Sequence, residues 1–326
     1  MIQPWRIVIR RTGGPEVLER EDLGPLEPGP GELLVQHEAI GLNFIDTYHR
    51  SGLYPLALPS GLGGEGAGII ETIGQSVEGF AVGDRVTYLS RTPGAYATHR
   101  LVPAERAIKL PEGISTETAA ATLLKGCTAE YLVERCAKVQ SGDAVLVHAA
   151  AGGVGSILVP WLKAVGATVI AHAGSAGKAQ RASDLGADHA LSCPLEELAD
   201  QVRTLTAGEG AKVVLDSVGA ASWKASLAST ARRGLLATYG NASGPVPPIP
   251  PAELTAAGSI FVTRPTLADY TATRDELQLS AGRLFEMIEK GVVKVHINAC
   301  FPLTDAADAH RALESRATTG STVLIP

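Results

Sequence analysis

The chain has 326 residues, of which 45% are hydrophobic and 19% are charged, and its formal net charge is -6. This length exceeds what one hydrophobic core normally supports, so two domains are expected, and the apolar content excludes a disordered chain. The negative charge argues against nucleic acid or an anionic membrane as the main partner.

Residues 1–21 carry arginines and a Gly-Gly-Pro instead of a continuous apolar run, so no signal peptide is predicted. No stretch of the sequence is long and uniformly apolar enough to predict a membrane span. The four cysteines lack a close pairing pattern, which favours reduced thiols. The sequence therefore predicts a cytoplasmic protein.

The N-terminal third is predicted to form a partly closed β-structure, because short apolar runs alternate there with Gly and Pro. The expected strands cover residues 5–10, 32–40, 67–73, 85–89 and 96–102. From Thr116 the pattern becomes helical, and from Asp143 strands alternate with helices. The strands expected there cover residues 143–148, 168–172, 189–193, 212–216, 235–239 and 259–263. These six strands match two mononucleotide-binding halves of a doubly wound parallel sheet.

The C-terminal part has no obvious core of its own. The proline-rich stretch 244–251 is predicted to be a surface loop, followed by helices over 274–290 and 304–315 and a final strand over 322–325. We expect these last elements to complete the N-terminal domain. The predicted domains are therefore 1–125 with 266–326, and an inserted nucleotide domain over 126–265.

A glycine-rich turn follows the first strand of the nucleotide domain. It reads His148-Ala-Ala-Ala-Gly152-Gly153-Val154-Gly155 and leads into a helix over 156–165. Such a turn exposes backbone N–H groups at the positive end of a helix dipole, where a pyrophosphate commonly binds. A glycine-rich turn alone can also be purely structural, but the flanking strands favour binding.

Several motifs together resemble the zinc-independent quinone oxidoreductases related to zeta-crystallin, within the medium-chain dehydrogenase/reductase superfamily. These motifs are Ala39-Ile-Gly-Leu-Asn43-Phe-Ile-Asp46-Thr-Tyr48, Arg50-Ser-Gly-Leu-Tyr54-Pro55, Leu58-Pro-Ser-Gly-Leu-Gly-Gly-Glu65, Lys125-Gly-Cys-Thr128, Asp216-Ser-Val-Gly219, Tyr239-Gly-Asn241 and Glu314-Ser-Arg316. The resemblance implies an α/β fold with a GroES-like β domain, a Rossmann domain with a six-stranded sheet, and an active cleft between them. Two positions depart from the family pattern: Pro160 stands in the helix after the glycine turn, which should kink that helix, and Cys193 replaces a tyrosine common near the ribose phosphate.

The resemblance also implies which residues touch the nicotinamide cofactor. The implied cofactor contacts are Asn43, Phe44, Tyr48, Thr128, Tyr131, Gly152, Gly153, Val154, Gly174, Ser175, Lys178, Cys193, Ser217, Tyr239, Gly240, Asn241, Phe261, Val262, Thr263 and Arg316. Asn43, Tyr48 and Tyr54 are the candidate catalytic residues. A tyrosine could stack on a quinone ring and support its developing oxyanion, and the alternative is that Tyr48 and Tyr54 only line the pocket.

The expected cofactor is NADPH. An NAD-binding fold places Asp or Glu at the end of the second strand, whereas residues 171–178 here read Ala-His-Ala-Gly-Ser-Ala-Gly-Lys. Ser175 and Lys178 can instead pair with a 2′-phosphate. The alternative for Lys178 is an ordinary solvated lysine in a first helical turn.

No metal site is predicted. Catalytic zinc needs three ligands from Cys, His or carboxylate. Asn43 and Gly66 occupy the positions of zinc ligands in related alcohol dehydrogenases, and the cysteine cluster of their structural site is missing.

The leading hypothesis is an NADPH-dependent quinone reductase, because a quinone needs little activation to accept a hydride. Reduction of the activated C=C bond of an enone or alkenal is the alternative within enzymes. An RNA-binding or structural protein that retains NADPH is the alternative from another class, and the acidic composition argues against RNA. The strand over 259–263 should form a sheet edge, which predicts a homodimer joined through the Rossmann sheets.

Overall fold

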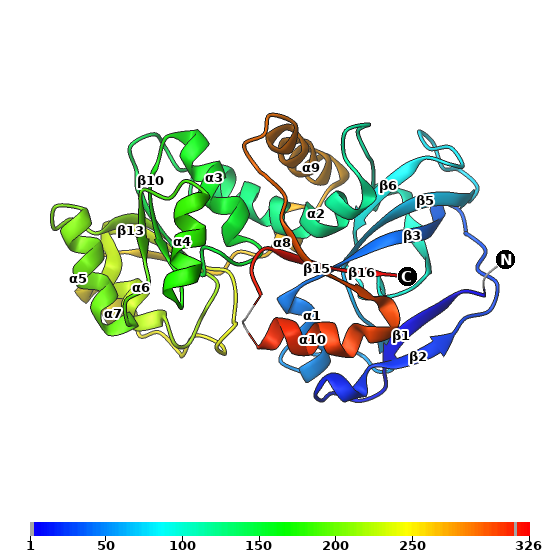
Figure 1. Cartoon of the computed structure of the whole chain (residues 1–326), viewed down its shortest axis with the longest axis horizontal. Coiled ribbons are helices and arrows are strands. Elements are labelled where there is room, and N and C mark those ends of the chain that lie inside the picture. Colours follow the sequence, from blue (N-terminus) through cyan, green and yellow to red (C-terminus); the bar gives the residue numbers. More distant parts are fainter. Residues whose placement is uncertain (1–2, 316–317) are drawn as a thin grey trace. The chain divides into compact units, whose positions relative to one another are not determined.

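The computed structural model describes residues 3–315 and 318–326, and the chain divides into two compact units (Figure 1). Unit 1 comprises Met1–Gly126, Thr271–Glu289 and Val295–Pro326, and unit 2 comprises Cys127–Tyr270 and Lys290–Lys294. Unit 2 is thus continuous in sequence for most of its length, and unit 1 is assembled from both ends of the chain.

Unit 1 is built mainly of antiparallel strands. Its strands are β1 (Trp5–Ile9), β2 (Glu19–Asp22), β3 (Glu32–Leu42), β4 (Ser60–Gly61), β5 (Glu65–Ile73), β6 (Arg85–Leu89), β7 (His99–Pro103), β8 (Ala107–Lys109), β15 (Ile297–Pro302) and β16 (Ser321–Ile325). Its helical segments are η1 (Pro15–Val17), α1 (Phe44–Ser51), η2 (Ala104–Arg106), most of α2 (Thr116–Glu130), α9 (Arg274–Glu289), η4 (Leu303–Asp305) and α10 (Ala306–Glu314). The larger sheet has the order β15-β16-β3-β5-β6-β8, with β7 also paired to β3, and a small sheet has the order β2-β1-β4.

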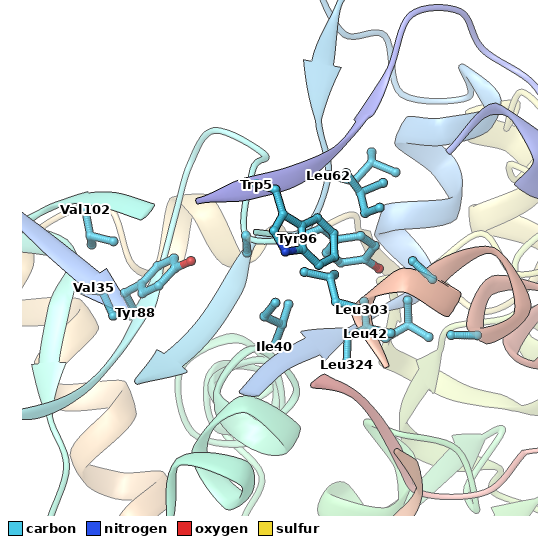
Figure 2. Packing of buried hydrophobic residues seen from close by; sticks show 14 of the residues in the cluster. Trp5, Val35, Ile40, Leu42, Leu62, Tyr88, Tyr96, Val102, Leu303 and Leu324 are labelled. Atoms are coloured by element: carbon cyan, nitrogen blue, oxygen red, sulfur yellow. The ribbon is translucent and has the colours of Figure 1, made fainter. Parts of the chain in front are cut away.

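The core of unit 1 lies between these two sheets and the C-terminal elements. Figure 2 shows Trp5 from β1 and Tyr96 packed with Leu303 and Leu324 from the end of the chain. Tyr96 is fully buried, so its ring fills the core while its hydroxyl group needs a hydrogen-bond partner there. Helices α1 and α10 lie side by side, which joins segments from opposite ends of the sequence (Figure 1).

Unit 2 is a doubly wound α/β sheet. Its strands are β9 (Ala144–His148), β10 (Thr168–His172), β11 (His189–Leu191), β12 (Ala211–Asp216), β13 (Thr230–Thr238) and β14 (Phe261–Thr263), and its helical segments are η3 (Tyr131–Cys136), α3 (Gly155–Val165), α4 (Ala176–Asp184), α5 (Leu195–Leu205), α6 (Trp223–Ser229), α7 (Pro251–Ala256) and α8 (Leu267–Tyr270). All strands are parallel in the order β11-β10-β9-β12-β13-β14, which is the Rossmann order. The predicted six-stranded Rossmann sheet is confirmed.

Several local features differ from the sequence-based expectation, including the short elements β2, β4, β8, β15 and α8, which the sequence does not predict. Pro251, placed in the predicted loop, begins α7, because a proline fits the first helical turn, where its missing N–H needs no partner. Helix α1 is not among the predicted elements, although Asn43 and Asp46 have the spacing of a helix-capping pair. Helix α3 continues through Pro160 to Val165, so the proline does not end it.

The start of α3 requires glycine for a packing reason. A Cβ atom on Gly155 would lie 2.4 Å from the carbonyl oxygen of Ala149 and 2.7 Å from the Cα atom of Ala150. Because those neighbours are backbone atoms, they cannot move aside cheaply. The glycine therefore lets α3 begin directly against the end of β9.

This packing predicts that Gly155→Ala lowers the free energy of unfolding by about 1–3 kcal/mol, the usual cost of overpacking. Gly177→Ala is the matched control, because no atom lies within 4 Å of a Cβ atom there and residue 177 lies in α4. The control should keep or slightly raise stability, since alanine favours a helix. Urea unfolding followed by circular dichroism compares both variants, and equal midpoints would contradict the prediction.

Candidate active site

The candidate site in unit 1 is built around the start of α1. Asn43 is the N-cap residue of this helix, and its backbone N–H donates to Asp46 Oδ2 at 2.9 Å. The Asn43 side chain is buried, and its Nδ2 donates to Glu65 Oε1 at 2.7 Å. Asn43, named from the sequence as a catalytic candidate, is therefore rigidly held by two carboxylates.

The other candidates in this unit form an aromatic group on α1 and the turn after it. The Tyr48 ring lies 6.4 Å from Phe44 and 5.3 Å from Tyr54, centroid to centroid, the second pair edge to face. All three side chains are partly exposed. The structure thus brings Phe44, Tyr48 and Tyr54 together beside Asn43 and gives them a face that a flat ring could contact.

A buried hydrogen-bond chain continues from Asp46 across unit 1. The Tyr96 hydroxyl donates to Asp46 Oδ2 at 2.9 Å and lies 3.0 Å from His310 Nε2. Arg50 Nη1 donates to His310 Nδ1 at 2.9 Å, so the neutral ring carries its proton on Nε2 and donates it to Tyr96. Arg50 also pairs with Glu314, with a distance of 2.6 Å between Nη2 and Oε1.

Burial is the largest cause of the pKa shifts of Asp46 and His310 in this series of hydrogen bonds. It raises the pKa of Asp46 to about 7, against the opposing hydrogen bonds from Asn43 and Tyr96. It lowers the pKa of His310 to about 3, and the positive charge of Arg50 acts in the same direction. Asp46 Oδ1 is buried without a hydrogen-bond partner in the described part of the chain, which fits a carboxyl group that takes up a proton near neutral pH.

The sequence analysis did not single out Tyr96, His310 or Arg50 as site residues. His310 and Arg50 are 260 positions apart, and no local pattern reports such a contact. The capping pair Asn43 and Asp46 was the available signal, because it predicts a helix that starts at the site.

Most candidate cofactor residues of unit 2 lie at the carboxyl ends of the strands of its sheet. Parallel strands end at the same edge, and most of the predicted residues follow those ends. Gly152, Gly153 and Val154 follow β9; Gly174, Ser175 and Lys178 follow β10; Cys193 follows β11; Ser217 follows β12; and Tyr239, Gly240 and Asn241 follow β13. Arg316 lies outside the described residues.

The glycine-rich turn fits an anionic group. Val154, the N-cap of α3, provides no side-chain hydrogen bond, and the N–H groups of Ser156 and Ile157 already donate to backbone carbonyls, so an anion would meet the N–H groups of residues 153–155. Gly174 has no atom within 4 Å of a Cβ position, which leaves its backbone approachable. Ser175 caps α4 by accepting from the N–H of Lys178, whose side chain is partly exposed.

The remaining candidates of unit 2 divide between the interior and an exposed edge. Thr128 is buried on α2, and Tyr131 is buried in η3, where its ring stacks on Tyr270 at 4.4 Å. Val262 and Thr263 lie partly buried in β14, whereas Phe261, which begins that strand, is 64% exposed. Phe261 is therefore placed as a sheet-edge residue, two positions before the end of the strand.

A buried carboxylate braces the carboxyl end of β12. Asp216 Oδ2 accepts from Ser222 and Ser226, both at 2.6 Å, and Oδ1 accepts from the N–H of Val218 at 2.7 Å. His148, the last residue of β9, reaches Ser226 Oγ at 2.9 Å, which ties β9 to α6. This network fixes the strand end from which the glycine-rich turn departs.

The described residues contain no group of three or more His, Cys, Asp or Glu side chains that could hold a metal ion. The positions 43 and 66 hold Asn and Gly, neither of which supplies a ligand that zinc prefers. Searching the same residues also finds no helix long and apolar enough to cross a membrane.

A Rossmann unit inserted in a β-rich unit defines the class of medium-chain dehydrogenases and reductases. Residues 29–112 match the alcohol dehydrogenase GroES-like domain, and residues 153–279 match the zinc-binding dehydrogenase family. A quinone oxidoreductase of Pseudomonas aeruginosa is 48% identical over 98% of this chain and 99% of its own length. The chain belongs to the quinone oxidoreductase family of this superfamily.

Two further relatives bear on the chemistry. The structure of Escherichia coli quinone oxidoreductase complexed with NADPH is 45% identical, with a TM-score of 0.96 over 99% of this chain and 100% of that one. A 2-haloacrylate reductase from Burkholderia is 41% identical over 98% of both chains. The name of the first protein contains the predicted acceptor, a quinone, and its structure contains the predicted cofactor, NADPH. The name of the second protein indicates a substrate with a C=C bond, 2-haloacrylate.

The position of Asp46 generates a prediction about stability. Its pKa is about 7 in the folded protein and near 3.8 in an ordinary environment, so the folded state binds the proton more tightly. The stabilisation is fully present below the unfolded pKa and is lost as pH rises towards 7. Asp46→Asn removes this titration while keeping an acceptor for Tyr96.

We therefore expect the unmodified protein to lose roughly 2–3 kcal/mol of stability relative to Asp46→Asn between pH 5 and pH 8. Urea unfolding at several pH values measures the difference. Parallel pH profiles for the two proteins would show that Asp46 titrates in its ordinary acidic range.

Proposed function

We infer that this chain is an NADPH-dependent quinone oxidoreductase, in which NADPH, a quinone and a proton give NADP⁺ and the hydroquinone. Full-length relatives named quinone oxidoreductase, together with two similar structures that contain NADPH at 45% and 47% identity, carry this conclusion. When bound, NADPH supplies the hydride. The protein residues then bind the partners, orient them and deliver a hydrogen bond or a proton.

We propose the following division of work. In unit 2, the glycine-rich turn at residues 152–155 binds the pyrophosphate, and Ser175 with Lys178 binds the 2′-phosphate. In unit 1, Asn43 contacts the nicotinamide, and the Tyr48 and Tyr54 rings hold the quinone with a phenol hydroxyl near its oxygen. The partly exposed aromatic group and the buried Asn43 support these roles.

We also propose that this activity is independent of zinc, because Asn43 and Gly66 replace the zinc ligands of related alcohol dehydrogenases. The cysteines, which form no disulfide among the described residues, support a cytoplasmic location as part of the proposal. Reduction of an activated C=C bond is a second candidate, favoured by the 2-haloacrylate reductase relative.

Steady-state NADPH oxidation against a panel of quinones, enones, 2-haloacrylate and aldehydes tests the function. We expect kcat/KM to be highest for a quinone, and unchanged after exhaustive chelation. Preference for an enone or 2-haloacrylate would favour the second candidate. Failure with every acceptor would overturn the enzymatic assignment, and loss of activity on chelation with restoration by zinc would overturn zinc independence.

Cofactor selectivity gives a prediction for Lys178. Losing one charge-assisted phosphate contact costs about 1.5–3 kcal/mol, so Lys178→Ala should raise the NADPH dissociation constant roughly tenfold to a hundredfold. The NADH dissociation constant should barely change. Lys212→Ala is the control, because Lys212 is an exposed lysine near the start of β12, at the opposite edge of the sheet. Fluorescence titration measures both cofactors, and equal affinity of the unmodified protein for NADH and NADPH would refute the 2′-phosphate contact.

The exposed strand β14 gives a prediction about assembly. It ends the sheet order of unit 2 and carries Phe261, so we propose that two chains pair these edges as a homodimer. Phe261→Asp should convert the dimer to a monomer. Leu279→Asp, at a comparably exposed apolar residue of α9, should leave it dimeric. Analytical ultracentrifugation decides the question, and a mass of one chain for the unmodified protein at micromolar concentration would exclude the dimer.

A further inference from the structure

Glu65 is a fully buried carboxylate that fixes the side chain of Asn43. Its Oε1 accepts from Asn43 Nδ2 at 2.7 Å, and its Oε2 accepts from the N–H of Leu124, also at 2.7 Å. An ionised carboxylate only accepts hydrogen bonds, so the Asn43 carboxamide must turn its nitrogen towards Glu65. The amide oxygen of Asn43 is thereby directed away from Glu65.

Protonation of Glu65 would disturb this arrangement. A neutral carboxyl group carries an O–H donor, and both oxygens of Glu65 already face N–H donors. One of the two hydrogen bonds would weaken or break. The orientation of Asn43 therefore depends on whether Glu65 is ionised.

Lys125 of α2 is the cation next to this carboxylate. Its side chain is 6% exposed, and its Nζ lies 3.7 Å from Glu65 Oε1. The buried Nζ has no hydrogen-bond acceptor within the described residues, so its effect on Glu65 is that of a nearby charge. Burial raises the pKa of Glu65, and the Lys125 charge opposes that increase.

The other titratable groups around Glu65 do not supply a positive charge. Asp46 on α1 is a second carboxyl group, and the negative charge of Glu65 contributes to raising the pKa of Asp46. Tyr88 on β6 and Tyr96 interact with Glu65 as buried neutral phenols whose pKa values are raised by burial. His37 on β3 faces Gly66 and stays neutral, because burial lowers its pKa to about 4.

We propose that Lys125 and Glu65 are positioning residues for the reduction: the ammonium group keeps Glu65 ionised, and ionised Glu65 holds the Asn43 carboxamide in its working orientation. The proposal rests on the proposed function, in which Asn43 contacts the nicotinamide. It assigns a role to a buried lysine that acts on Asn43 through Glu65. Gly41 makes room for the arrangement, since a Cβ atom there would lie 2.2 Å from Glu65 Oε1.

Lys125→Met tests the proposal, because it keeps much of the side-chain volume and removes the charge. The pKa of Glu65 should then rise further, so that a larger fraction of the molecules holds Glu65 protonated at a given pH. At a pH one unit below the pKa of Glu65 in Lys125→Met, about a tenth of the molecules keep Glu65 ionised. The kcat of Lys125→Met should therefore be about tenfold lower at that pH and should recover as the pH rises. The NADPH dissociation constant should stay unchanged. Lys109→Met, which removes an exposed lysine paired with Asp84, is the matched control and should alter neither value.

Glu65→Gln and the double variant Glu65→Gln/Lys125→Met complete the cycle. Both should have a reduced kcat without the new pH dependence, because the titrating group is gone. The infrared carbonyl band of a protonated carboxyl group gives a readout in the protein without cofactor. At pH 7, the spectrum of Lys125→Met minus that of the double variant should show this band. The spectrum of the unmodified protein minus that of Glu65→Gln should not show it.

Lys125→Met with an unchanged kcat–pH profile and no carboxyl band would overturn the proposal. If Lys125→Met does not fold, an unchanged kcat in Glu65→Gln would overturn it as well. Absence of quinone reduction by the unmodified protein would instead refute the proposed function. The infrared comparison would then still decide whether Lys125 controls the ionisation of Glu65.

Discussion

The hydrogen bonds of the buried Glu65 carboxylate are the constraint on which the site in unit 1 depends. A buried charge is tolerated only when it is paired and hydrogen-bonded. Glu65 meets this requirement with Asn43 at the start of α1 and with Leu124 and Lys125 on α2. A strand residue thus joins two helices, and the first of those helices carries the aromatic group at which a quinone is proposed to bind.

Unit 2 also contains a buried carboxylate, and its hydrogen-bond partners are of a different kind. Asp216 is buried at the end of β12, and its oxygens accept from serine hydroxyls and a backbone N–H. These donors are all neutral, in contrast to the Lys125 ammonium group beside Glu65. Phosphate binding near this strand end is proposed to draw on the N–H groups of the glycine-rich turn and on Lys178.

The sequence predicted the strands of the Rossmann sheet and the glycine-rich turn, because apolar periodicity and glycine spacing are local signals. It predicted Asn43 and the tyrosines through their motif, but not the groups that hold them. The contacts of Arg50 with His310 and of Tyr96 with Asp46 join segments that are distant in sequence, and their energies depend on burial. Such contacts follow from tertiary packing, which periodicity does not report. At Pro251 the local signal itself is ambiguous, because proline is typical of loops and also suits the first turn of a helix.

The strand order of unit 1 has a consequence for how the protein is made. β16 lies between β15 and β3, so a strand that follows all the others in the sequence forms an internal strand of the larger sheet. Until β16 is made, Ile40–Leu42 at the end of β3 lack a partner on the side where β7 pairs with Glu32–Gln36, and unpaired strand groups of this kind invite association with other chains. Unit 2 is almost continuous in sequence and can fold earlier during synthesis. A nascent chain truncated before β16 would therefore combine a finished nucleotide-binding unit with an open, aggregation-prone sheet.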